Sequence, residues 1–177
     1  MLFRSCAKGA GVTTIATGLA ASLSEIGDGN VLLIDMNLEQ GAVHPFHRGK
    51  PGCALPDVLD SHKRDAALVH ENLYMVSARD VNAKLRMLPK RFTDLFPKFK
   101  ASDYDYIIFD MPEMSPTSMT PRMARFMDMV LLVIESERSS EEAVKEASNL
   151  LINSEAPLAS VLNKTRTYCP KWLNQNC

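Results

Sequence analysis

The chain has 177 residues, of which 46% are hydrophobic and 23% charged, and this ordinary globular composition predicts a single domain over residues 1–177. Lys and Arg number 20 against 21 Asp and Glu, so the formal net charge of −1 provides no general basic field and nucleic acid is not an expected partner. The apolar runs fall far short of the roughly 20 residues of a membrane-spanning helix, so we expect a cytoplasmic chain.

Short apolar runs recur along the chain, with helical segments between them. The predicted strands are Leu2–Phe3, Val31–Ile34, Tyr106–Phe109, Val130–Ile134 and Ala159–Leu162. These runs do not alternate with polar residues, as expected when helices cover both faces of a parallel sheet. The order of the elements therefore predicts an α/β fold that is doubly wound around a mostly parallel sheet.

A glycine-rich turn follows the first strand directly and leads into an amphipathic helix. Glycines let the backbone approach an anion closely, and the free N–H groups at the N-terminus of a helix face that anion. Strand, turn and helix in this order are the context that a phosphate loop requires. The candidate nucleotide-binding residues of this segment are Gly9, Ala10, Gly11, Val12, Thr13 and Thr14.

The turn departs from the Walker A pattern at one position. That pattern places a lysine against the β- and γ-phosphates and a hydroxyl on Mg²⁺. Thr13 fills the hydroxyl position, whereas Val12 stands where the lysine is expected. Lys8, four residues upstream, is a candidate for a substitute charge. Taken alone, the turn favours nucleotide binding only slightly over a tight turn that binds nothing.

Helical spacing of apolar residues predicts three helices. The residues expected to face inward are Ile15, Leu19, Leu23 and Ile26 in the first helix, Phe92, Leu95, Phe96 and Phe99 in the second, and Ala143, Ala147, Leu150 and Leu151 in the third. Gly27 would end the first helix, and Ser139 with Glu142 would form a capping box at the start of the third. Residues 41–76 have the least regular pattern, and we expect them to form an excursion beside the sheet.

Two aspartates end predicted strands. Asp35 follows the run Val31–Ile34, and Asp110 follows the run Tyr106–Phe109. Ligands of open α/β sheets bind at the carboxyl ends of the strands, and Mg²⁺ prefers oxygen ligands. Each aspartate alone could be a helix cap, but the two beside a glycine-rich turn favour a metal site. The predicted metal ligands are Thr13, Asp35 and Asp110.

These motifs, in this order, resemble the MinD/ParA-like P-loop ATPases, and more closely the cytoplasmic domain of the bacterial tyrosine kinases that accompany polysaccharide chain-length regulators. The matching stretches are 8–14 as a degenerate Walker A motif, 31–38 as the second acidic motif, 104–112 as Walker B and 161–163 as a late strand. The resemblance implies ATP or ADP with Mg²⁺ as cofactors and places Asn163 beside the nucleotide base. It also implies a partner, either a membrane polysaccharide chain-length regulator or another export-machinery protein, with a peripheral location at the inner membrane.

Two departures weaken the expected catalysis. Val12 replaces the phosphate lysine, and Asn37 replaces the second aspartate of the family's acidic motif. Asp35 is the candidate for polarising an acceptor hydroxyl or water, with Lys8 as the stand-in cation. The leading hypothesis is a nucleotide-binding domain of kinase type with weak or lost activity. The alternatives are a MinD/ParA-type module whose nucleotide state controls dimerisation or interaction, and a scaffold that has lost nucleotide altogether.

Overall fold

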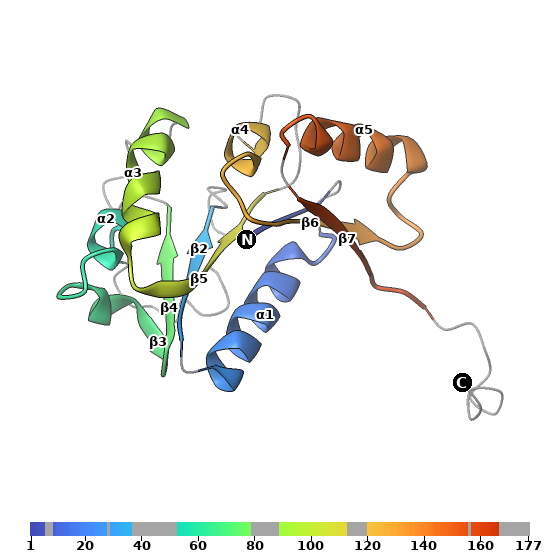
Figure 1. Ribbon diagram of the computed structural model, residues 1–177. Helices are drawn as coiled ribbons and strands as arrows, with labels where there is room; N and C mark the ends of the chain where they lie inside the picture. Colours follow the sequence, from blue (N-terminus) through green and yellow to red (C-terminus); the bar gives the residue numbers. More distant parts are fainter. Residues whose placement is uncertain are drawn as a thin grey trace, which may run out of the picture.

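The computed structural model describes residues 1–5, 9–27, 29–36, 53–78, 89–112, 120–155 and 157–166. Within these ranges one seven-stranded sheet has the order β3-β4-β2-β5-β1-β6-β7 (Figure 1). The strands are β1 (Leu2–Ser5), β2 (Asn30–Asp35), β3 (Leu68–His70), β4 (Leu73–Ser77), β5 (Tyr104–Asp110), β6 (Val130–Glu135) and β7 (Leu158–Asn163). Neighbouring strands run parallel, except for the antiparallel pair β3 and β4. The predicted α/β class and mostly parallel sheet are confirmed.

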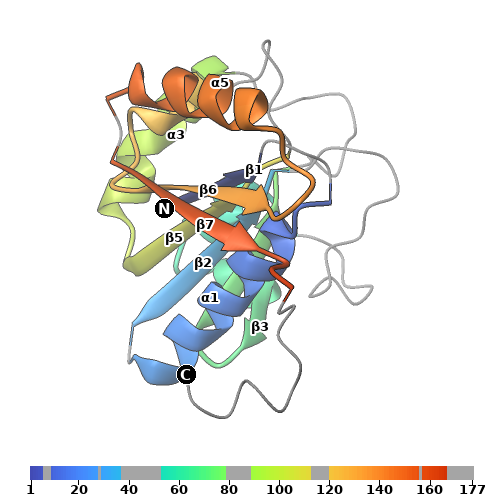
Figure 2. The ribbon, with the colours of Figure 1, turned by 90° about the vertical axis from the view of Figure 1, so that its right-hand side faces the viewer.

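The helices lie on both faces of the sheet, as the turned view in Figure 2 also shows. They are α1 (Val12–Ile26), α2 (Leu55–Val58), α3 (Pro89–Ala101), α4 (Thr120–Ala124) and α5 (Glu141–Ile152), with the 3₁₀ turn η1 (Arg64–Ala67) after α2. Alternate residues of β2 belong to two hydrophobic cores, one on each face of the sheet. Val31 and Leu33 pack on the α1 side, whereas Leu32 and Ile34 pack with residues of the other helices. Both faces are therefore covered, which explains the continuously apolar strands.

Two sequence predictions need correction: residues 68–76 of the irregular region 41–76 join the sheet, and Ile26 on α1 does not face inward. The excursion contains β4, a buried strand hydrogen-bonded in parallel to β2, and the antiparallel β3 beside it. On α1 the small Ala16 and Ala20 are fully buried, while Ile26 is 87% exposed. The other predicted inward residues, Ile15, Leu19 and Leu23, are partly buried and pack against the same core. Alanines let the helix backbone approach the sheet closely, so the larger apolar residues of α1 flank that contact instead of filling it.

The start of α5 differs by one residue from the predicted capping box. Ser140, and not Ser139, is the N-cap, and its hydroxyl accepts a hydrogen bond from the Ala143 N–H at 3.2 Å. The Ser139 hydroxyl instead accepts the Glu135 N–H at 3.1 Å, in the turn between β6 and α5. Both serines therefore satisfy a backbone donor, but they do so in different elements. The inward face is confirmed for Ala147 and Leu151, which are buried.

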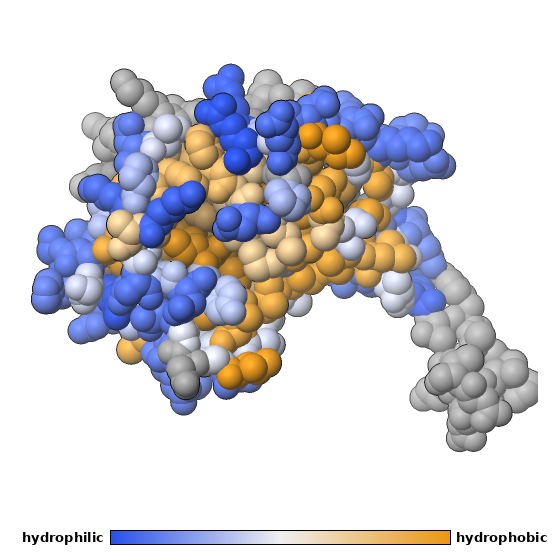
Figure 3. Space-filling model, in the orientation of Figure 1, coloured by the Kyte–Doolittle hydropathy of each residue, from blue (hydrophilic) through white to orange (hydrophobic). Residues whose placement is uncertain are grey.

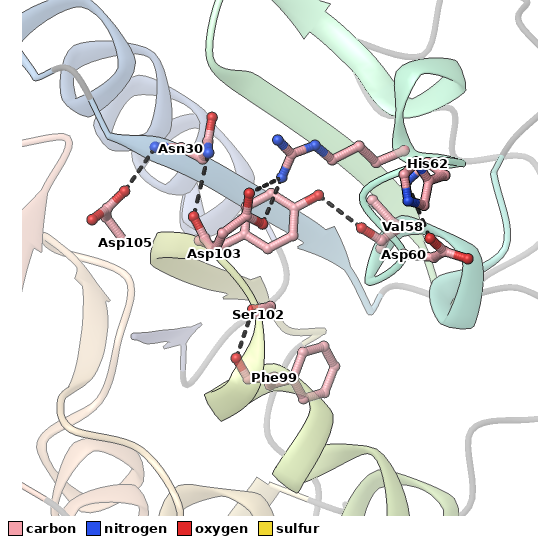
Figure 4. A network of polar contacts seen from close by, with 10 residues as sticks. Asn30, Val58, Asp60, His62, Phe99, Ser102, Asp103 and Asp105 are labelled. Carbon is pink, nitrogen blue, oxygen red and sulfur yellow. Dashed lines mark hydrogen bonds and ion pairs between the residues drawn. The ribbon is translucent and has the colours of Figure 1, made fainter.

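A polar network ties η1 to the amino-terminal edge of the sheet (Figure 4). The Arg64 guanidinium donates to both carboxylate oxygens of Asp103 at 2.6 Å, and it lies 4.9 Å from the ring centroid of Tyr74. Nearby, Asp105 accepts the Asn30 N–H at 2.9 Å. Burial raises the pKa of the Tyr104 hydroxyl, which donates to the Val58 carbonyl at 2.8 Å. This edge carries no predicted site residue, and its contacts explain how the α2–η1 segment is held against the sheet.

None of the helices within the described ranges has the length and apolar character needed to cross a membrane. Apolar residues gather near the middle of the face shown in Figure 3. A cavity of about 440 Å³ lies at the amino-terminal edge of the sheet, between α3, β5 and the segment that precedes β6. Its walls include Phe96, Phe99, Phe126 and Met129. It therefore opens at the end of the sheet opposite to the predicted nucleotide site.

Candidate functional site

The two predicted acidic ligands lie side by side at the carboxyl edge of the sheet. β2 and β5 are neighbouring parallel strands, and their register pairs Asp35 directly with Asp110. Both side chains are buried, with exposed fractions of 6% and 2%. On its other side β5 neighbours β1, and the glycine-rich turn follows the end of β1. The sheet therefore brings the two carboxylates to the base of the turn, as the sequence predicted.

The hydroxyl predicted to meet a metal points at one of these carboxylates. Thr13, in the first turn of α1, hydrogen-bonds the Asp110 side chain. The pKa of Asp110 is raised from 3.8 to about 6: burial is the main cause, the hydrogen bond from Thr13 lowers the pKa, and the neighbouring charge of Asp35 raises it. A raised pKa at a pair of adjacent buried carboxylates indicates a site that lacks positive charge and would be stabilised by a cation.

These oxygen groups fit a Mg²⁺ ion that is bound jointly by the protein and by the phosphates of a nucleotide. The described residues contain no group of three or more His, Cys, Asp or Glu side chains that could form an all-protein metal site. Mg²⁺ does not need one, because it is usually held by one or two carboxylates, several waters and substrate phosphates. Asp35, Asp110 and the Thr13 hydroxyl supply the protein's share of such ligands, so the donor chemistry agrees with the predicted cofactor.

The glycine-rich turn has the backbone of an anion-binding loop. Gly9 and Gly11 both adopt left-handed conformations, with φ of 82° and 90°, and Gly11 is the N-cap of α1. A Cβ at Gly11 would collide with the side-chain amide of Asn163, so this position requires glycine for two reasons. Val12, at the lysine position, is only 9% exposed and packs into the core on the α1 side. The loop is thus compatible with a phosphate but lacks the lysine charge.

Asn163 reaches the glycine-rich turn from β7. Its side-chain Nδ2 donates to the Ala10 carbonyl at 2.8 Å. The next residue, Lys164, also bonds to the loop: its Nζ donates to the Gly9 carbonyl at 2.6 Å and to Glu135 Oε1 at 2.9 Å. Glu135 and Lys164 were missed by the sequence analysis, because a glutamate at the end of β6 and a lysine after β7 form no local motif. The only available signal was their position at the carboxyl ends of predicted strands.

The structure therefore brings together most of the predicted site. One edge of the sheet collects the loop residues 9–14, Asp35, Asp110 and Asn163. Lys8 and Asn37 lie outside the described residues, so the substitute-charge hypothesis for Lys8 stays a prediction. The assignment of Asn163 to the nucleotide base also stays a prediction, and its hydrogen bond to the Ala10 carbonyl places this side chain against the glycine-rich turn.

Comparisons with known proteins agree on the fold. A protein of Ralstonia solanacearum that carries the name tyrosine-protein kinase EpsB is 27% identical over 164 residues, covering 87% of this chain and 21% of that protein. The kinase domain of the Escherichia coli tyrosine kinase ETK is 21% identical, with a TM-score of 0.69, and the match covers 96% of this chain and 70% of that domain. MinD of Pyrococcus horikoshii OT3, solved with Mg-ADP, is 22% identical with a TM-score of 0.69, covering 98% and 76%. No family model matches the chain.

The chain spans about a fifth of the length of the curated relatives that it matches. The similarity therefore concerns one region of those proteins. The solved structures resemble it over most of their own length, from bacterial tyrosine kinase domains to ATPases of the ParA and MinD type.

Proposed function

Because this chain has the MinD/ParA-like P-loop fold that bacterial tyrosine kinase domains share, we propose that it binds ATP or ADP together with Mg²⁺ at the carboxyl edge of its sheet. One observation carries the proposal: the Thr13 hydroxyl bonds to buried Asp110, which is paired in register with buried Asp35, directly beside a turn with two left-handed glycines. A turn that binds nothing gives no reason to bury two adjacent carboxylates against a helix N-terminus.

In this site the backbone N–H groups of residues 9–14 bind the nucleotide's phosphates. Thr13, through its hydroxyl, and Asp35 and Asp110, through water, are the residues that would hold Mg²⁺. The bound ion would neutralise phosphate charge and orient the phosphates. Asp35 is also the candidate for polarising an acceptor hydroxyl or a water molecule. Asn163 lies on the far side of the loop from the carboxylates and is the candidate for contacting the base.

Val12 limits what the site can catalyse. Charge-supplying groups at phosphoryl-transfer sites are worth about 10³–10⁵ in rate, and the valine supplies none. We therefore propose weak or lost phosphoryl transfer, with Lys8 as the candidate substitute cation. Because the missing lysine lowers the expected rate of phosphoryl transfer, a MinD/ParA-type module whose nucleotide state controls dimerisation or partner binding is the second candidate function.

The setting proposed for this activity is exopolysaccharide or capsule synthesis and export. It rests on the similarity to EpsB, named a tyrosine-protein kinase, and to bacterial tyrosine kinase domains. The partner would be a membrane polysaccharide chain-length regulator or another protein of the export machinery. Binding to it would bring the domain to the cytoplasmic face of the inner membrane.

Calorimetric titration with ATP and ADP, with and without Mg²⁺, tests the proposal. We expect binding that requires Mg²⁺, that Asp110→Ala weakens and that Val12→Lys strengthens. An exposed aspartate on α3 provides the control variant, Asp94→Asn, which should bind like the wild type. If wild-type protein binds no adenine nucleotide at millimolar concentration, the proposal is wrong and the chain is a scaffold. Rescue of binding by Val12→Lys alone would then identify the valine as the cause.

Two further measurements separate kinase from switch. For a kinase, Asp35→Ala should lower the turnover of ATP by a larger factor than it lowers the affinity for Mg-ADP, and unchanged turnover would remove Asp35 from catalysis. For a switch, light scattering should show a change of molecular mass between the ATP- and ADP-bound forms without phosphate transfer. The two results are independent, because one measures chemistry and the other assembly.

A further inference from the structure

Two consecutive residues at the end of β7 bond to two consecutive carbonyls of the phosphate loop. Asn163 Nδ2 donates to the Ala10 carbonyl, and Lys164 Nζ donates to the Gly9 carbonyl at 2.6 Å. Lys164 itself has a left-handed backbone, with φ of 58°, an unfavourable conformation for a lysine. An unfavourable backbone conformation persists where surrounding contacts hold it, and here the contacts of Lys164 Nζ with the Gly9 carbonyl and Glu135 hold this residue.

Glu135 is the group that fixes the ammonium. It is paired in register with Asn163 across β6 and β7, and its side chain is only 5% exposed. Its Oε1 lies 2.9 Å from Lys164 Nζ, and its buried Oε2 has no hydrogen-bond partner among the described residues. Arg138, 3.6 Å away, has a side chain that is 74% exposed. A buried carboxylate with one open oxygen is costly without a close cation, so Lys164 is its main partner.

The direction of the loop N–H groups follows from these contacts. In a planar trans peptide the C=O and N–H bonds point in opposite directions. The Gly9 carbonyl shares its peptide unit with the Ala10 N–H, and the Ala10 carbonyl shares its unit with the Gly11 N–H. Drawing both carbonyls toward β7 therefore turns both N–H groups away from it, where successive amides can form a concave anion site.

We infer that Lys164, held by Glu135, is a positioning residue that aims the Ala10 and Gly11 amides at the nucleotide's phosphates. This inference rests on the proposed nucleotide binding. It assigns Lys164 a role distinct from that of a Walker lysine, since its ammonium bonds to the carbonyl side of the loop. In a loop with Val12 at the lysine position, phosphate affinity depends on the amides, and so it depends on the residues that orient them.

Calorimetry with Mg-ATP, Mg-ADP and adenosine on four variants tests this inference. Lys164→Gln should weaken Mg-ATP and Mg-ADP binding by about tenfold or more, the size expected for losing a charge-assisted hydrogen bond, and leave adenosine affinity unchanged. Lys164→Arg should restore most of the affinity. Glu135→Gln should weaken binding in the same direction. The control is Lys145→Gln, which removes an exposed α5 lysine paired with Glu141.

Hydrogen exchange at Ala10 and Gly11 in nucleotide-free protein provides a second readout, and it should be faster in Lys164→Gln than in the wild type. Circular dichroism verifies that each variant is folded. Wild-type affinity for Mg-ATP in folded Lys164→Gln would overturn the inference, and so would an equal loss of adenosine affinity, which would place Lys164 at the base. If wild-type protein itself binds no nucleotide, the proposed function fails and the inference fails with it. Binding by the wild type and by Lys164→Gln alike defeats the inference alone.

Discussion

Replacing Asp110 with asparagine should raise the stability of the fold while removing a carboxylate that is proposed to bind a metal ion. The carboxylate is 2% exposed, and its pKa is raised from 3.8 to about 6 by burial and by Asp35, against the hydrogen bond from Thr13. A raised pKa means that the fold favours the protonated form. The protonated Asp110 side chain therefore contributes to the stability of the fold. This contribution is complete below about pH 4 and is lost as the pH rises through 6. At neutral pH the ionised carboxylate therefore destabilises the folded protein.

The size of this effect follows from the pKa values. A shift of about two pKa units, at 1.36 kcal/mol per unit, corresponds to about 3 kcal/mol. Asparagine stays neutral at every pH and can still accept the hydrogen bond from Thr13. We expect Asp110→Asn to be more stable than wild type by up to about 3 kcal/mol at pH 7.5, with the difference shrinking toward zero near pH 4.

Urea unfolding without Mg²⁺ at a series of pH values measures the difference. Asp94→Asn is the matched control, since that aspartate is exposed on α3, and it should show no comparable pH-dependent gain. A variant that is less stable than wild type at pH 7.5, or whose gain is the same at pH 4 and 7.5, would refute the reasoning. In the presence of Mg-ATP the order should reverse, because only the ionised carboxylate holds the ion, and wild-type Mg²⁺ affinity should fall below about pH 6.

Three other substitutions, and Gly18→Ala as a comparison for the first, test the loop, the cap and the core by urea unfolding. Gly11→Ala should lower the free energy of unfolding by about 1–2 kcal/mol, because φ is 90° and the new Cβ would collide with Asn163. Gly18 faces open space on α1, so Gly18→Ala should raise the free energy of unfolding by about 0.5–1 kcal/mol. Similar effects for both substitutions would contradict the strain argument. Ser140→Ala should cost about 1 kcal/mol through loss of the α5 cap, and an unchanged midpoint would remove that role. Phe92→Ala should cost about 3–5 kcal/mol, since the ring is 1% exposed among Phe96, Phe99, Phe109 and Phe126; a loss below 1 kcal/mol would show that the cluster is loosely packed.

Local patterns predicted the elements that hold the acidic site. Apolar runs located β2 and β5, and the rule that parallel strands end at one edge predicted that Asp35 and Asp110 would meet. The same patterns missed β4, although Leu73–Val76 is an apolar run of four residues, because nothing local shows that such a run pairs with β2. Short apolar runs are ambiguous until a partner strand selects them.

Tertiary contacts decided the details that the patterns got wrong. Ser139 and Ser140 are equivalent as sequence signals for a cap, and the turn after β6 uses the first of them. Ile26 continues the helical spacing of α1 but extends past the sheet contact that Ala16 and Ala20 make, so it remains exposed. Propensity and periodicity locate a helix, whereas the residues that approach the sheet are set by how closely the two elements can pack.

The shape of the phosphate loop and its charge have separate origins in this chain. Its shape comes from two left-handed glycines and from carbonyl contacts made by Asn163 and Lys164, none of which involves the side chain at position 12. Its charge would come from a lysine at that position, where Val12 instead packs into the apolar core on the α1 side. The valine can therefore be tolerated by the fold without collapse of the loop. This separation explains how the loop can keep its shape with an apolar residue at position 12.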